Sequence, residues 1–242
     1  MNELAEAATT NETLPPSGYD AIHLLVYGVK QTPNGAKPTT PGLIQLNACM
    51  DLLKQGLAKN VVIGGVNYGV AQGDTRISTV YADTLRKRLM DKGLGGINVI
   101  AEAEVTPDAQ IESGSKDTGG EVDFLLSQAK ANNWQNVLCV GYEPHVKRAT
   151  KLYKSRGVSI SDTDDEDVLK VKTESSNEIL ETKHPEFETR FEKSPYRKTE
   201  GNSFVKNEKL KVMIMDLVDR KGSIISWVAH HTPNDLKLKL NS

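Results

Sequence analysis

Cysteine is scarce in this chain, and the cysteines that occur do not form a metal-binding motif. Only Cys49 and Cys139 are present among the 242 residues, and neither belongs to a CxxC or Cys/His arrangement of metal-ligand spacing. Both lie in segments that we predict as a helix interior and a buried strand. We therefore interpret them as two reduced thiols of the core rather than as a disulfide bridge.

Long apolar runs and an excess of one charge are absent as well. No apolar run approaches the roughly 18 residues of a membrane-spanning helix, so no membrane span is predicted. Lysine and arginine number 30, and aspartate and glutamate number 32. The resulting net charge of −2 argues against a nucleic-acid surface built on bulk basicity.

The N-terminal segment lacks the pattern of a signal peptide. Glu3, Glu6 and Glu12 stand where a cationic region followed by an apolar region would be needed. Residues 1–18 have no periodicity and end in Pro-Pro-Ser-Gly, so we predict a flexible tail. A cytoplasmic protein is expected.

Short apolar runs alternate with helical patterns over most of the chain. The expected strands cover residues 21–27, 61–65, 97–101 and 137–140, with a short fifth strand at 158–160. The expected helices cover residues 43–55 and 75–92, a segment opened by Gly119 and Gly120, and residues 144–154. This alternation predicts right-handed βαβ crossovers and a Rossmann-like three-layer α/β fold with a mostly parallel sheet.

The character of the chain changes after residue 161. Residues 162–167 contain five acids, and residues 208–220 have the apolar spacing of an amphipathic helix. We assign residues 19–161 to the Rossmann-like domain. Residues 162–242 are assigned to a polar acidic linker and a C-terminal helix that packs on the domain or extends it.

Polar loops follow the predicted strands, and the carboxyl ends of parallel strands are where ligands bind in such sheets. The candidate ligand contacts in these loops are Gly28, Gly64, Gly65, Ser115, Asp117 and Thr118. Two interpretations stay open for the glycine pair after the second strand, a tight turn or a close backbone approach to a phosphate or carboxylate. Two also stay open for Thr118, which is either a helix N-cap or a ligand-binding hydroxyl.

His145 and Arg148 follow the fourth strand and lie three residues apart, so they share one face of the next helix. Two interpretations stay open for this pair: Arg148 supplies fixed charge for an anion, or His145 is solvated and Arg148 pairs with an acidic neighbour. His145 and Glu112 are the acid/base candidates if a reaction occurs. The chain has no nucleophile elbow, HExxH, GxGxxG or Walker motif, so the reaction itself is not indicated.

The order of these pieces resembles the YdcF/SanA-like family of domains of unknown function over residues 19–157. The shared positions are Leu46, Leu52 and Gly56 of the first helix, the strand VVIGG, Glu112, Ser115 and Thr118, and the closing motif with His145, Arg148 and Ala149. Gln45, Asp117, Gly120 and Glu121 replace the family's arginine, asparagine, glutamate and final asparagine. The resemblance implies a Rossmann-like fold with a polar pocket at the strand ends and a nucleotide-like ligand, S-adenosylmethionine included.

Two functions are therefore expected as alternatives. The first is a domain that binds a small anionic or nucleotide-like molecule, with transferase or hydrolase activity as the reaction classes to test. The second is a non-enzymatic, degenerate family member that acts through a protein–protein or homodimer contact of residues 162–242.

Overall fold

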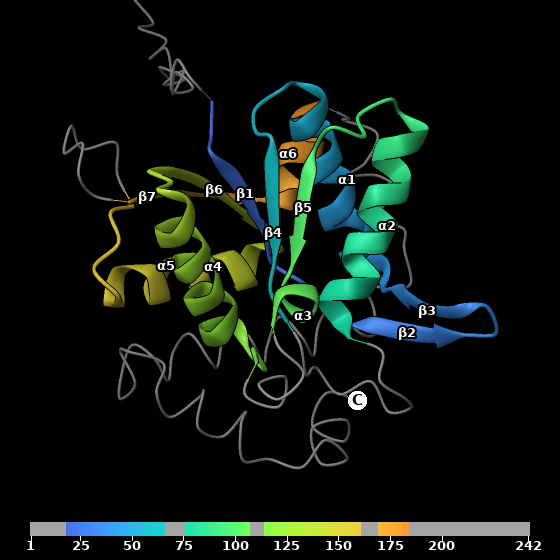
Figure 1. Cartoon of the computed structure of the whole chain (residues 1–242), viewed down its shortest axis with the longest axis horizontal. Helices are drawn as coiled ribbons and strands as arrows, with labels where there is room; N and C mark the ends of the chain where they lie inside the picture. Colours follow the sequence, from blue (N-terminus) through green and yellow to red (C-terminus); the bar gives the residue numbers. More distant parts are fainter. Residues whose placement is uncertain (1–17, 66–75, 107–113, 161–168, 184–242) are drawn as a thin grey trace, which may run out of the picture.

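Five short strands form the sheet on which the rest of the fold is arranged (Figure 1). The computed structural model describes residues 18–65, 76–106, 114–160 and 169–183. The order across the sheet is β5-β4-β1-β6-β7, and every neighbouring pair is parallel. The strands are β1 (Ala21–Leu24), β4 (Asn60–Ile63), β5 (Asn98–Ala101), β6 (Asn136–Gly141) and β7 (Lys170–Ser175).

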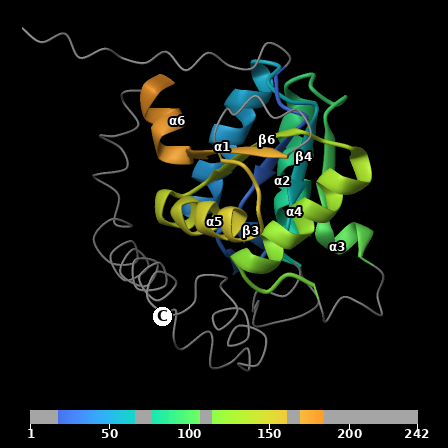
Figure 2. The same cartoon turned by 90° about the vertical axis from the view of Figure 1, so that its left-hand side faces the viewer.

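Helices cover both faces of this sheet, which gives the three layers of a Rossmann-like fold and confirms the predicted fold class (Figure 2). One face carries α1 (Thr40–Lys54), α2 (Ile77–Asp91) and α6 (Ser176–Lys183), and the other carries α4 (Thr118–Asn132) and α5 (Glu143–Ser155). The four-residue α3 (Glu102–Val105) follows β5 directly.

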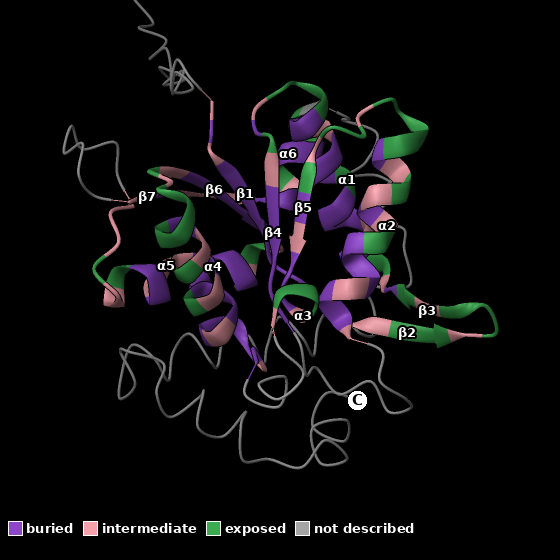
Figure 3. Ribbon diagram, viewed as in Figure 1, coloured by how far each residue is buried: buried purple, intermediate pink, exposed green. Residues whose placement is uncertain are grey.

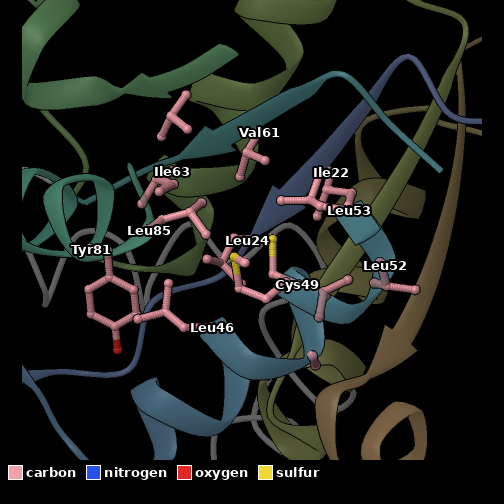
Figure 4. Packing of buried hydrophobic residues seen from close by; sticks show 14 of the residues in the cluster. Ile22, Leu24, Leu46, Cys49, Leu52, Leu53, Val61, Ile63, Tyr81 and Leu85 are labelled. Carbon is pink, nitrogen blue, oxygen red and sulfur yellow. The ribbon is translucent and has the colours of Figure 1, made fainter. Parts of the chain in front are cut away.

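The central strand shows why the sequence folds into three layers. Ile22 and Leu24 of β1 belong to the core beneath α1 and α2, whereas Ala21 and Leu25 belong to the core beneath α4 and α5. Successive side chains of a strand point to opposite faces, so a continuous apolar run fills both cores. Figure 3 shows the central strands β1, β4 and β6 buried along most of their length, and Figure 4 shows part of the first core. Full burial of one such side chain stabilises the fold by about 1.5–3 kcal/mol.

The predicted cysteine state is confirmed. Cys49 of α1 and Cys139 of β6 are both buried and unbridged. Since Cys49 lies in the first core and Cys139 in the second, the sheet separates them. Within the described residues, no helix combines the length and apolar character needed to cross a bilayer.

The fifth strand was predicted in the wrong place. Residues 158–160 form only an isolated bridge between Ser159 and Lys170, and the strand is β7, Lys170–Ser175. The sheet therefore continues past the boundary predicted at residue 161, and α6 packs on α1. The acidic run 162–167 and the amphipathic segment 208–220 lie outside the described residues.

Residues 29–42, between the predicted strand 21–27 and the predicted helix 43–55, contain two strands that the sequence did not indicate. They form an antiparallel hairpin of β2 (Val29–Thr32) and β3 (Gly35–Pro38), which projects from the body of the fold (Figure 1). The first turn of α1 follows at once. Exposed glycine, proline and lysine residues dominate this hairpin, so its sequence has no apolar alternation to reveal the two strands.

Candidate functional site

The strand order has one reversal point, between β1 and β6. The chain moves from β1 outward to β4 and β5, then returns across β1 to β6 and β7. In open parallel sheets of this type, the carboxyl ends at the reversal point leave room for a ligand. The first turns of α4 and α5 lie at this edge of the sheet, because each helix begins close to the carboxyl end of a strand.

His145, Thr118 and Arg148 meet at these two helix starts. The Oγ1 atom of Thr118 lies 2.5 Å from Nε2 of His145 and accepts a 3.0 Å hydrogen bond from Nε of Arg148. A second nitrogen of the guanidinium, Nη2, also donates to Oγ1 of Thr118. All three side chains are buried, with 4%, 1% and 7% of their surface exposed. The predicted pair on α5 is thus brought together with Thr118 of α4.

Glu121 completes this cluster from the first turn of α4. Its Oε2 lies 3.5 Å from Nε2 of His145, and its Oε1 accepts a 3.3 Å hydrogen bond from the backbone N–H of Val26, just after β1. The residue is fully buried. Gly64, after β4, allows Glu121 to pack this close to the strand end, because a Cβ atom at position 64 would lie 2.9 Å from Cγ and 3.0 Å from Cα of Glu121.

A second buried acid, Glu102, organises the neighbouring loops. Its Oε2 accepts a 2.7 Å hydrogen bond from the N–H of Gly65, and its Oε1 accepts bonds from the N–H and hydroxyl of Ser115 at 2.9 and 2.8 Å. Burial raises the pKa of the Glu102 carboxyl, and the charge of Glu121 raises it further, while the bonds from Ser115 and Gly65 oppose the shift. Gly65 and Ser115 thus bind a carboxylate of the protein itself.

His23 and Tyr153 form a second buried polar contact, on the face of the sheet that α4 and α5 cover. Nδ1 of His23, on β1, lies 2.5 Å from the hydroxyl of Tyr153 on α5. Burial, together with the charge of His145, lowers the pKa of His23 to about 3. Burial raises the pKa values of the Tyr153 hydroxyl and the Cys139 thiol. At neutral pH the side chains of His23, Tyr153 and Cys139 are therefore uncharged, and they pack in the core as neutral groups.

The remaining predicted contacts have structural partners elsewhere. The carbonyl of Gly28 accepts hydrogen bonds from the N–H of Thr39 at 3.3 Å and from the hydroxyl of Tyr81 at 3.3 Å, at the base of the hairpin. Asp117, and not Thr118, is the N-cap of α4, since its Oδ1 accepts a 2.9 Å bond from the N–H of Gly120. Glu112 lies outside the described residues.

Three residues of this region were not predicted from the sequence: Glu121, Glu102 and His23. Glu102 had a usable signal, because it directly follows a strand at the edge where ligands bind. Glu121 and His23 had none that distinguishes a buried polar side chain from an exposed one. Their burial follows from the approach of α4 to Gly64 and from the position of β1 in the middle of the sheet.

No protein-family model, no curated protein and no solved structure matches the chain. Across the described ranges, no group of three or more histidine, cysteine, aspartate or glutamate side chains is placed to hold a metal ion.

Proposed function

We propose that this protein binds a small anionic or nucleotide-like ligand at the carboxyl edge of its sheet, between the first turns of α4 and α5. Arg148 supplies the fixed positive charge, and Thr118 and His145 supply hydrogen bonds. The protein works in the cytoplasm as a member of the YdcF/SanA-like family, and S-adenosylmethionine is one candidate ligand that the family resemblance suggests.

The observation that carries this proposal is the burial of four polar side chains at the reversal point of the sheet. Thr118, Glu121, His145 and Arg148 are each more than nine-tenths buried and come from two different helix starts. Burial of charged groups costs several kcal/mol per ion unless they are paired and hydrogen-bonded. A cluster of ionisable groups kept at such a position is typical of a functional site.

His145 is the group that would exchange a proton with a bound molecule, because one ring nitrogen of imidazole can donate a proton and the other can accept one. Glu112 stays the second acid/base candidate on sequence grounds alone. Transferase and hydrolase reactions both use such a group, and both are to be tested on any ligand that binds.

A thermal-shift panel of nucleotides, S-adenosylmethionine and simple phosphates tests the proposal. A ligand present at 100 times its Kd stabilises the folded state by about 2.7 kcal/mol. For a domain of this size, that stabilisation raises Tm by roughly 5–10 °C. The variant in which both His145→Ala and Arg148→Ala are introduced should lose the shift.

Lys147→Ala is the matched control, because Lys147 is a cation on the same helix turn that is 65% exposed and paired with Glu143. A shift that survives the double variant places the ligand elsewhere. The absence of any shift, together with a mass that depends on protein concentration, supports the alternative of a partner contact made by residues 162–242.

A further inference from the structure

Two atoms of the cluster have no hydrogen-bond partner among the described residues. They are Oε2 of Glu121 and Nδ1 of His145, and both are fully enclosed. Oε2 lies 3.5 Å from Nε2 of His145, which is longer than a hydrogen bond. Buried polar atoms nearly always have a hydrogen-bond partner in folded proteins. Two such atoms without a partner at the carboxyl edge of the sheet therefore indicate which hydrogen-bonding groups a ligand would bring.

The hydroxyl of Thr118 determines which ring nitrogen of His145 carries the proton. A hydroxyl has two lone pairs and one proton. The two lone pairs on Oγ1 accept the N–H groups from Nε and Nη2 of Arg148, so the proton is directed to Nε2 of His145. Nε2 is therefore an acceptor, and the neutral ring carries its proton on Nδ1. This also explains why Oε2 of Glu121, next to Nε2, receives no hydrogen bond.

The cluster thus offers a ligand both a hydrogen-bond donor, Nδ1 of His145, and an acceptor, Oε2 of Glu121. Arg148 and the Nδ1–H of His145 suit an anionic oxygen, whereas the carboxylate of Glu121 suits a donor. A simple anion bound here would lie close to the Glu121 carboxylate and be repelled by it. That carboxylate has one 3.3 Å backbone hydrogen bond from Val26 on its other oxygen, so a cation would compensate its buried charge.

We infer that the ligand is a zwitterion, with an anionic group on Arg148 and His145 and an ammonium group on Glu121. This inference rests on the proposed function and narrows its ligand class.

Three compounds of equal length test the inference by isothermal titration calorimetry on the intact chain at neutral pH: propyl phosphate, 2-hydroxyethyl phosphate and phosphoethanolamine. They differ only in a terminal methyl, hydroxyl or ammonium group. A parallel series of butanoate, 3-hydroxypropanoate and β-alanine replaces phosphate by carboxylate and shows which anion the site prefers. In the better series, the ammonium compound should bind about 10- to 100-fold more tightly than the methyl compound, because a charged hydrogen bond is made only by the former.

Glu121→Gln should remove this preference, since the amide keeps the shape of the side chain without its charge. Glu143→Gln is the matched control: Glu143 lies on the first turn of α5 but is 55% exposed and paired with Lys147. It should leave the ranking unchanged. If Glu121→Gln fails to fold, the ligand series on the unaltered chain decides the question alone.

The two proposals fail in different ways. Equal affinity for the three members of a series, or a hydroxyl compound that binds more tightly than its ammonium counterpart, overturns the zwitterion while the anion site stands. No binding of any compound overturns the anion site and the zwitterion with it.

Discussion

Glu102 should be a main stabilising residue of the loops beside the candidate site. Its carboxylate accepts hydrogen bonds from the N–H of Gly65, the N–H of Ser115 and the hydroxyl of Ser115. Glu102→Ala leaves two buried N–H groups without an acceptor, at about 1–3 kcal/mol each, while the hydroxyl can rotate toward another partner. Removal of a buried carboxylate offsets part of this loss, so the expected decrease in the free energy of unfolding is about 2–4 kcal/mol.

Glu102→Gln separates the hydrogen bonds from the charge. A glutamine keeps one acceptor oxygen and turns its NH2 toward either Gly65 or Ser115, so one side of the arrangement is lost. The expected loss is about 1–2 kcal/mol, smaller than that of the alanine variant. Urea denaturation followed by far-UV circular dichroism measures both variants against the unaltered chain.

The pH dependence of the free energy of unfolding shows whether ionisation of Glu102 stabilises or destabilises the fold. Because the folded-state pKa of Glu102 is raised, protonation favours the folded state. This contribution is present in full below the unfolded pKa of about 4.3 and is lost as pH rises through the higher folded pKa. The destabilisation by Glu102→Gln should therefore shrink over the pH interval above the unfolded pKa, in which the Glu102 carboxyl ionises in the folded state. If it grows over this interval instead, the three hydrogen bonds outweigh burial and the reasoning is refuted.

Three other predictions concern Gly64 beside the cluster and buried side chains of the two cores. Gly64→Ala should lower the free energy of unfolding by about 1–3 kcal/mol, because the new Cβ would lie about 3 Å from Glu121. Gly95→Ala, which meets no atom within 4 Å, should be close to neutral in the same denaturation experiment. The imidazole protons of His23 should show no titration in NMR spectra down to about pH 5, since its pKa is about 3. Because that pKa is lowered, its contribution to stability is present above the unfolded value of about 6.5 and declines as pH falls toward 3. Cys49, whose pKa burial raises to about 12, and Cys139 should react with a thiol reagent only after unfolding, and rapid reaction of the native chain would contradict their burial.

The parallel core was predictable from the sequence because its signal is local. Runs buried on both faces read as continuous apolar segments, and the helices between them repeat apolar residues on one face, as Ile77, Tyr81, Leu85 and Leu89 of α2 do. The edge strand β7 lacks this signal. Only Val171 and Ser175 of its six residues are buried, so its sequence reads as polar, and the more apolar segment 158–160 was chosen in its place.

The location of the candidate site was predictable from the sequence, but the contacts of its side chains were not. His145 and Arg148 follow a buried strand, and their spacing placed them on one helix face before any contact was known. The roles of Ser115 and Gly65 depend on Glu102, whose burial arises from long-range packing. A local pattern carries no information on such contacts, so residues predicted to face a ligand were found bonded to a carboxylate of the protein.

The most direct test of the central claim is a crystal structure of the chain grown with phosphoethanolamine. The account predicts that the phosphate contacts the guanidinium of Arg148 and Nδ1 of His145, with the ammonium group on the carboxylate of Glu121. A compound bound with no contact to the first turns of α4 and α5 would contradict the claim that this edge of the sheet is the ligand site.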